Sequence, residues 1–451
     1  MNKSIWFDEA YSAYLARLDY SDIVAVTARD LHPPLYYILL KAWSGVFGHS
    51  IVAMRLLSTA FGVVTIAFIH RLIKTMAGIR ASALAALAIS IMPLFVYYGQ
   101  EMRMYTMMTA IVFAASYVLV VAVERATLPW WTLYGALVAL GMWTHYFVVF
   151  VWIAHLCWLV WRYRREVLNR STVIAYATAL LLFAPWLPTV VRRFFFSEVE
   201  NSWVPPLSLS QIVDFVGSVF FARQMTRSPI TVAMAAVIVV VGYYVVRNWK
   251  SLKNLELVVL MAVVPVLALL ALSVFRPEFV ERYLLPSAVS AVIVSVLSLR
   301  ELPVKQLAAS CLVLALCFGA FAFRAVTGQR ADGDMAQFAR DIAAASGSSE
   351  EVILSRVYRA YYDLSFYDTG HVLFLSEFVQ DEPTWGYYAP PMKDDLDIAA
   401  SYEALLADGF SIWEIAPDGF VPTYPDRVVV ITEIGGPVGL HATKLQLLPS
   451  R

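Results

Sequence analysis

Two adjacent carboxylates near the start of the chain, Asp8 and Glu9, are the first residues whose types could do chemistry. They lie in the segment IWFDEAY at 5–11, among aromatic and apolar residues. A carboxylate beside apolar walls can accept a proton from a hydroxyl group or contact a metal ion. Charged residues near a chain terminus more often only face water, so the pair is a catalytic candidate only if other residues support it.

Eight further residues fall at or near the ends of apolar segments, and we expect them to bind a substrate. They are His32, Tyr36, Glu101, Arg103, Tyr105, His145, Arg282 and Tyr283. His32 precedes two prolines, which fix its backbone direction. Arg282 is expected at the start of a helix, where its guanidinium group and nearby backbone N–H groups can bind an anion such as a lipid phosphate.

Simpler interpretations stay open for several of these residues. A histidine among aromatic residues, such as His145, is more often an interfacial residue than a ligand. Arg282 has the alternative role of a snorkelling interfacial arginine, and Glu101 with Arg103 that of a surface ion pair worth little energy. The histidines and carboxylates lack the spacing of a metal site, so a divalent metal ion stays an open question as a cofactor.

The chain that positions these residues is far more apolar than a soluble protein. Of its 451 residues, 60% are hydrophobic and 15% are charged, against about 25% charged residues in soluble domains. The sequence therefore predicts an all-α polytopic membrane protein. A formal net charge of zero gives no basic field for nucleic acid. No P-loop or dinucleotide fingerprint occurs, so an activated donor is expected to arrive within the membrane.

Apolar runs of suitable length predict about ten membrane spans. They lie at 51–73, 81–98, 105–123, 130–145, 147–161, 172–191, 229–247, 255–275, 283–299 and 306–323. The short pair 130–145 and 147–161 has the alternative of one broken hairpin. Residues 10–29 predict an amphipathic helix too polar to span, and residues 35–47 an interfacial or re-entrant helix. The stretch 8–48 is thus a loop with interfacial helices.

Lysine and arginine are more frequent in one set of alternate loops, which we therefore expect in the cytoplasm. This orientation puts Asp8, Glu101 and Arg282 on the outer side of the membrane, with the other candidate residues.

The composition becomes more polar after about residue 325. Helical spacing at 333–345 precedes the apolar run at 352–354, a pattern typical of an α/β unit. We therefore expect a transmembrane catalytic domain at 1–325 and a small, soluble, extracytoplasmic α/β domain at 326–451.

Six motifs follow one another in an order more specific than any one of them. They are WFDEA at 6–10, HPPLYY at 32–37, FGHS at 47–50 with MRL at 54–56, QEMRMY at 100–105, THYF at 144–147 and ERYLLP at 281–286. This order resembles the bacterial branch of the GT-C glycosyltransferases, the family 39-like relatives that include protein mannosyltransferases and aminoarabinose transferases. The resemblance covers about residues 6–325.

The resemblance implies a multi-pass protein of the bacterial cell membrane with its active site outside the cytoplasm. Such an enzyme moves a hexosyl or pentosyl group, with inversion, from a polyprenyl-phosphate-linked sugar donor to a hydroxyl group of a protein, lipid or polysaccharide acceptor. Asp8, with Glu9 beside it, matches the base, and Arg282 matches the phosphate-binding residue best, with Arg103 second. The family's span before the Asp-Glu motif is not seen in this sequence, so an outward N-terminus and a longer natural chain are both open.

A non-catalytic polyprenyl-lipid binding or transport protein is the main alternative, and a membrane scaffold is a third hypothesis. A transporter is expected to carry ionisable residues near the middle of its spans. Here the candidate residues gather at one face instead, which favours an enzyme. The sugar, the acceptor and the oligomeric state are not determined by the sequence.

Overall fold

The computed structural model of the protein describes most of the chain and divides it into two compact units. The described residues are 4–30, 32–163, 169–196, 204–221, 242–244, 247–248, 255–299, 335–346, 351–367, 371–375, 411–418, 428–436 and 440–447. The first unit, here the N–C unit, comprises Met1–Asp30, Tyr37–Met54 and Gly328–Arg451. The second, the helical unit, comprises Leu31–Tyr36 and Arg55–Thr327. The expected domain boundary at 325 lies outside the described residues.

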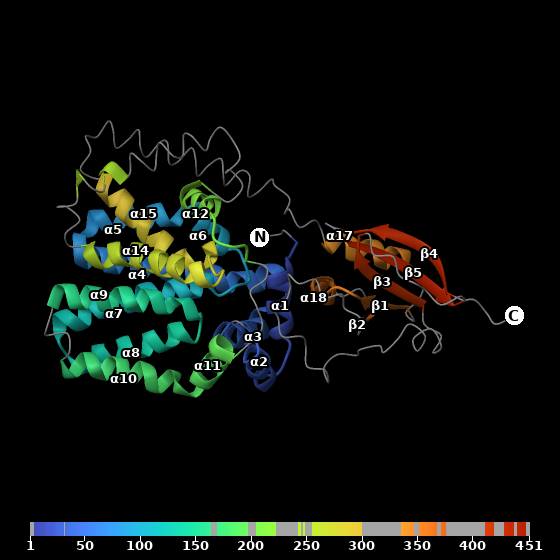
Figure 1. Ribbon diagram of the computed structural model, residues 1–451, viewed down its shortest axis with the longest axis horizontal. Helices are drawn as coiled ribbons and strands as arrows, with labels where there is room; N and C mark the ends of the chain where they lie inside the picture. Colours follow the sequence, from blue (N-terminus) through green and yellow to red (C-terminus); the bar gives the residue numbers. More distant parts are fainter. Residues whose placement is uncertain are drawn as a thin grey trace. The chain divides into compact units, whose positions relative to one another are not determined.

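The helical unit is built from apolar helices, several of which run in roughly one direction (Figure 1). In chain order these are α4 (Ile51–Ala77), α5 (Ile79–Ser90), α6 (Pro93–Tyr98), α7 (Tyr105–Arg125), α8 (Leu128–Met142), η1 (Tyr146–Val148), α9 (Val149–Tyr163), α10 (Arg170–Phe183), η3 (Ala184–Trp186), α11 (Leu187–Phe196), α12 (Leu209–Phe221), α14 (Glu256–Phe275), η5 (Glu281–Leu284) and α15 (Leu285–Leu299). Helix α8 packs between α7 and α10, and α14 packs against α9 and α15.

Six helical stretches of the described residues are long and apolar enough to cross a membrane. They are Ile51–Ala77, Tyr105–Arg125, Tyr146–Tyr163, Arg170–Arg192, Glu256–Phe275 and Glu281–Leu299. Each matches a predicted span, and the mainly helical membrane fold is confirmed. The count of about ten is not confirmed, because the predicted span at 306–323 and nearly all of that at 229–247 lie outside the described residues.

Two predicted spans differ from the helices that form. The segment 81–98 is divided into α5 and α6, because Pro93 has no N–H to donate and begins a new helix. The segment 130–145 forms α8, which has only 15 residues. It is followed by the separate helices η1 and α9, so 130–145 and 147–161 are distinct elements joined by a turn at Trp143–His145.

Small residues allow two close approaches within the helical unit. A Cβ atom added at Gly135 of α8 would overlap the backbone oxygen of Ala175 in α10. A Cβ atom at Gly141 would lie 2.5 Å from Cζ2 of Trp152 in α9. Small residues at such crossings are typical of membrane helices, since they let backbones and rings pack closely.

The N-terminal part of the N–C unit contains three helices. They are α1 (Phe7–Leu15), α2 (Tyr20–Thr27) and α3 (Leu35–Phe47), of which the first two residues of α3 belong to the helical unit. The single amphipathic helix predicted at 10–29 is therefore two helices, because the backbone of Asp19 is extended (φ −69°, ψ 156°) and starts α2 anew. The helix predicted at 35–47 forms over those same residues.

The C-terminal part of the N–C unit is a small α/β sheet structure, as the sequence predicts. Its elements are α17 (Met335–Ala345), β1 (Glu351–Ser355), α18 (Tyr358–Tyr367), β2 (Val372–Leu375), β3 (Ser411–Pro417), β4 (Val428–Gly435) and β5 (Leu440–Leu447). The strand order is β2-β1-β3-β5-β4, with β1 parallel to β2 and β3, and β5 antiparallel to β3 and β4.

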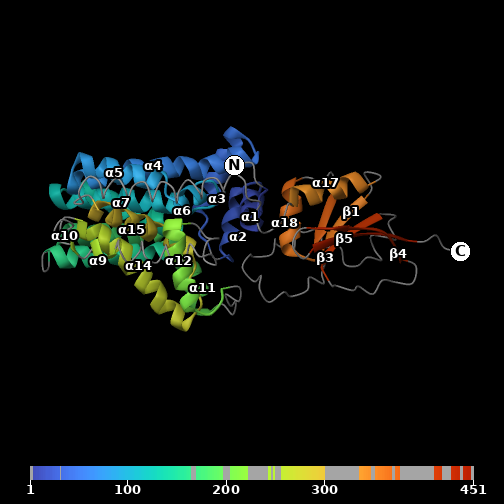
Figure 2. The ribbon, with the colours of Figure 1, turned by 90° about the horizontal axis from the view of Figure 1, so that it is seen from above.

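Both helices of this part pack on one face of the sheet, and α17 lies over the strands in Figure 2. The core there contains Met335, Phe338 and Ile342 of α17, Ala360 and Leu364 of α18, Ile353 of β1, Trp413 and Ile415 of β3, and Ala442 of β5. Burial of these large apolar side chains is the main stabilising contribution.

Candidate functional site

The carboxylate pair lies in the first turn of α1 and is not a solvated chain end. Asp8 is 4% exposed and Glu9 is 0% exposed. The hydroxyl group of Ser12 donates a hydrogen bond of 2.8 Å to the backbone oxygen of Asp8, within the same helix. Negative charge in a first helical turn is favoured by the helix dipole, which offsets a small part of the cost of burying these carboxylates.

Helix α1 is fixed by the aromatic residues of α18, which is 350 residues away in sequence and adjacent in Figures 1 and 2. The Tyr362 ring lies 5.9 Å from that of Phe7, 5.5 Å from that of Tyr11 and 5.2 Å from that of Tyr14, between ring centroids. The backbone N–H of Ile5 donates a 2.9 Å hydrogen bond to the hydroxyl oxygen of Tyr367. Edge-to-face aromatic packing of this kind orients the helix that carries the carboxylates.

In the helical unit, α4 holds the loop that carries Glu101 and Arg103. Thr59 donates a 2.7 Å hydrogen bond to the backbone oxygen of Gly99, and Ser58 donates one of 3.0 Å to that of Arg103. The hydroxyl groups of Tyr36 and Ser58 are 3.0 Å apart. The first turn of α3 therefore lies beside the residue of α4 that holds the backbone of Arg103. Both charged side chains are buried, so they do not form the exposed surface ion pair considered above.

His145 lies in the turn between α8 and η1 and is surrounded by rings from other segments. The centroid of its imidazole ring is 5.4 Å from that of His32, 4.9 Å from that of Tyr283 and 6.1 Å from that of Tyr105. The backbone N–H of Leu35 donates a 3.3 Å hydrogen bond to the backbone oxygen of Trp143. This bond connects the segment that follows His32 with the turn that contains His145.

The ring of His145 is neutral and offers a hydrogen-bond donor. Burial is the main reason that the pKa of His145 lies well below its ordinary value, and electrostatic interactions with His32, Arg103 and Arg282 lower that pKa further. The backbone N–H of Phe147 donates to Nδ1 at 3.3 Å, so the ring proton is on Nε2. Nε2 is buried and has no hydrogen-bond partner among the described residues.

Arg282 and Tyr283 lie in η5, the short turn that leads into α15. The guanidinium carbon of Arg282 is 5.9 Å from the centroid of the Tyr283 ring. The neighbouring Glu281 accepts a 3.2 Å hydrogen bond from the hydroxyl group of Tyr98, which connects η5 with the end of α6. Arg282 therefore lies in the first turn of a helical segment, as the sequence predicts.

The structure thus brings candidate residues from four segments together within the helical unit. We call Arg103 and Arg282 the cation cluster, which lies around the neutral ring of His145 beside His32; the aromatic rings of Tyr105 and Tyr283 also lie beside His145. Tyr36 is connected with Arg103 through Ser58, and Glu101 lies in the same short loop. Asp8 and Glu9 belong to the N–C unit.

No metal centre is apparent in the described part of the chain. No group of three or more His, Cys, Asp and Glu side chains there is arranged to hold a metal ion. The expectation about a divalent ion stays untested.

Several residues of interest were not among those singled out from the sequence. Arg55 is buried although it lies in a predicted span, and the motif MRL at 54–56 contains it. His155 is also fully buried within α9, where its Nε2 is 3.0 Å from the Ser116 hydroxyl oxygen and its Nδ1 is 3.1 Å from that of Tyr134. A histidine in the middle of an apolar span was the signal that could have identified this network.

Comparison with known proteins gives a consistent result in sequence and in fold. A family model for dolichyl-phosphate-mannose-protein mannosyltransferase matches residues 31–188, which include His32, Arg103 and His145. No curated protein matches the chain in sequence.

Two solved structures of ArnT from Cupriavidus metallidurans are similar to nearly the whole chain. The apo structure has a TM-score of 0.66 at 15% sequence identity, covering 98% of this chain and 93% of that one. The structure bound to undecaprenyl phosphate has a TM-score of 0.61 at 14% identity, covering 98% and 94%. The chain therefore has the fold of ArnT, and the resemblance to GT-C glycosyltransferases that its motifs indicate is confirmed.

Proposed function

We propose that the protein is a membrane glycosyltransferase that moves a sugar from a polyprenyl-phosphate-linked donor to an acceptor hydroxyl group. The observation that carries the proposal is the cation cluster around the buried Nε2–H group of His145. Buried positive charge with an unused donor is suited to an anion, because charge-assisted hydrogen bonds offset the loss of hydration.

The cation cluster is assigned to the phosphate of the donor. Arg103 and Arg282 supply guanidinium groups, which match phosphate oxygens in geometry and keep their charge at any working pH. His145 adds a neutral N–H donor from a ring fixed by its hydrogen bond with Phe147. When the sugar leaves, negative charge increases on the phosphate oxygen, and donors already in position stabilise that charge. The similarity to a protein solved with undecaprenyl phosphate supports this assignment.

Asp8 is assigned as the base, following the resemblance to the family. Its carboxylate accepts the proton of the acceptor hydroxyl group while the acceptor oxygen forms a bond to the anomeric carbon of the sugar. The bond between that carbon and the phosphate oxygen breaks, and its electron pair leaves with the phosphate. A single displacement of this kind inverts the configuration. Glu9 follows Asp8 on the same turn of α1 and is assigned a supporting role near the acceptor.

The remaining assignments concern the surroundings of the reaction. His32, Tyr36, Glu101, Tyr105 and Tyr283 are proposed to orient the donor. The active site and the C-terminal α/β domain, with its boundary near residue 325, are proposed to lie on the extracytoplasmic side of the cell membrane, because the lysine and arginine residues favour that orientation. The sugar and the choice among protein, lipid and polysaccharide acceptors are left to experiment.

The test is transfer of label from radiolabelled polyprenyl-phosphate sugars to a membrane extract by the purified full-length protein. Arg282→Gln is expected to reduce donor affinity about 10- to 150-fold, the equivalent of one hydrogen-bonded charge. Arg276→Gln is the matched control, because the Nε atom of Arg276 is already 3.1 Å from a carboxylate oxygen of Glu278. Binding of undecaprenyl phosphate without transfer from any donor would replace the proposal by the alternative of a non-catalytic lipid carrier.

A further inference from the structure

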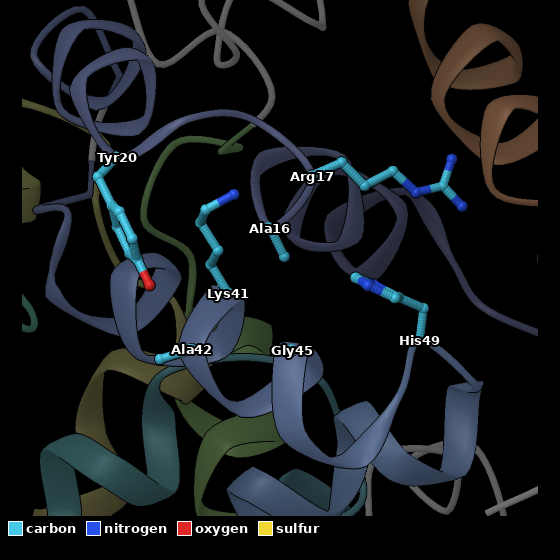
Figure 3. A pocket seen from close by; sticks show the side chains of 7 residues that line it. All are labelled: Ala16, Arg17, Tyr20, Lys41, Ala42, Gly45 and His49. Atoms are coloured by element: carbon cyan, nitrogen blue, oxygen red, sulfur yellow. The ribbon is translucent and has the colours of Figure 1, made fainter.

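A groove in the N–C unit lies between the connection from α1 to α2 and the C-terminal part of α3, and it carries three basic side chains. Its lining residues are Ala16, Arg17, Tyr20, Lys41, Ala42, Gly45 and His49, around a cavity of about 400 Å³ (Figure 3). Cavities of 300–1,000 Å³ are typical of small-molecule sites. None of the lining residues is acidic, so the groove presents only positive charge and neutral groups to an occupant.

Lys41 and His49 are available to a ligand in the groove, whereas Arg17 already donates a hydrogen bond to another segment. Nη1 of Arg17 donates a 2.9 Å hydrogen bond to the backbone oxygen of Ser365, and the side chain extends away from Lys41 in Figure 3. Lys41 extends into the space beside Tyr20, with its Nζ atom 5.3 Å from the centroid of that ring. The small side chains of Ala42 and Gly45 leave room below the Lys41 amine and the His49 ring.

The groove lies next to apolar surface that points to a lipid. Val46 and Phe47 are 76% and 57% exposed and lie together at the end of α3, where they extend the groove with apolar surface. The rings of Trp43 and Phe47 lie 4.1 Å apart between centroids, and such aromatic residues are typical of membrane interfaces. His49 comes two residues before α4, the first stretch long and apolar enough to span a membrane.

From this juxtaposition we infer that the groove binds the phosphate headgroup of an anionic membrane phospholipid, through Lys41 and His49. The headgroup phosphate accepts hydrogen bonds from the amine and the imidazole, and the acyl chains extend over Val46 and Phe47. This lipid is distinct from the sugar donor, whose phosphate is assigned to the cation cluster of the helical unit. Its role is to hold α3 and the start of α2 at the membrane surface.

The experiment measures binding of fluorescent phosphatidylglycerol to the full-length protein in neutral detergent, without any sugar donor. Lys41→Gln is expected to weaken binding about fivefold, the effect of one cation at an anionic lipid surface, and Lys41→Gln with His49→Gln to weaken it further. Lys41→Arg keeps the charge and is expected to bind like the wild type. Arg29→Gln removes an exposed arginine of the same unit outside the groove and serves as the matched control.

Three results would overturn the inference. They are unchanged binding by the folded double variant, equal binding of phosphatidylcholine, and displacement of the lipid by inorganic phosphate at equal concentration, which would indicate a site for free anions. Because no sugar donor is present, failure here leaves the proposed transfer reaction untouched. Failure of transfer likewise leaves lipid binding measurable.

Discussion

His145 offers the sharpest test of the cation cluster, because its two ring nitrogens have separate tasks. Nδ1 accepts from the backbone N–H of Phe147, and Nε2–H is proposed to donate to the phosphate. Asparagine and glutamine separate these tasks. The amide of His145→Asn reaches the position of Nδ1, so it preserves the backbone hydrogen bond but not the donor. The amide of His145→Gln reaches the position of Nε2 and preserves the donor.

The expected magnitude follows from the loss of one hydrogen bond to a charged group. Such a bond is worth about 1.5–3 kcal/mol, which corresponds to about 10- to 150-fold in affinity. His145→Asn should therefore weaken undecaprenyl phosphate binding by that factor. His145→Gln should lose less, because an amide N–H replaces Nε2–H at nearly the same reach.

The assay is equilibrium binding of undecaprenyl phosphate to the purified protein in detergent, with thermal unfolding of each variant as the control for folding. Equal affinity of wild type and His145→Asn would refute the assignment of Nε2–H to the phosphate. A larger loss for the glutamine than for the asparagine variant would also refute it, since that order indicates that only the backbone hydrogen bond matters.

Three further predictions concern stability. Tyr362→Ala removes the ring that contacts Phe7, Tyr11 and Tyr14. It should lower the free energy of unfolding by about 3–5 kcal/mol in a denaturant titration. Tyr362→Phe keeps the ring and should lower the free energy of unfolding far less. His145 binds fewer protons when folded than when unfolded, because its folded pKa lies well below the ordinary 6.5. Its contribution to stability should therefore fall as pH drops below 6.5, by at most about 1.4 kcal/mol per pH unit, and in melts between pH 7.5 and 5.5 the slope of His145→Asn should be shallower than that of the wild type by this contribution. Gly135→Ala should cost about 1–3 kcal/mol in thermal unfolding through overlap with the Ala175 backbone oxygen. Gly62→Ala should instead stabilise slightly, because its nearest neighbour, in Phe95, lies at 3.8 Å and alanine favours a helix interior over glycine.

Much of the fold could be predicted because its signals are local. Apolar runs predicted the six long helical stretches, and the motif order indicated the fold. Pro93, which divides a predicted span, was a visible signal whose effect on helix continuity was underestimated. The single helix predicted at 10–29 failed at Asp19, where no glycine or proline marks the break.

The sequence singled out residues that lie together in the helical unit, but it did not predict how they pack. His32, Arg103, His145 and Arg282 all end or begin apolar segments, and the ends of membrane helices gather near the same surface. The contact of Tyr362 with α1 depends on a sequence separation of about 350 residues, for which no local pattern exists. The neutral state of His145 likewise depends on burial and on electrostatic interactions with residues of three other segments.

The most direct test of the central claim compares turnover and donor binding in the wild type and in Asp8→Asn. A base that accepts the acceptor proton contributes about 10²- to 10⁴-fold to the rate. Asp8→Asn should therefore lose transfer of radiolabelled sugar by that factor, while it binds undecaprenyl phosphate as the wild type does and unfolds at the same temperature. Sugar transfer by Asp8→Asn at near the wild-type rate would contradict the proposed mechanism.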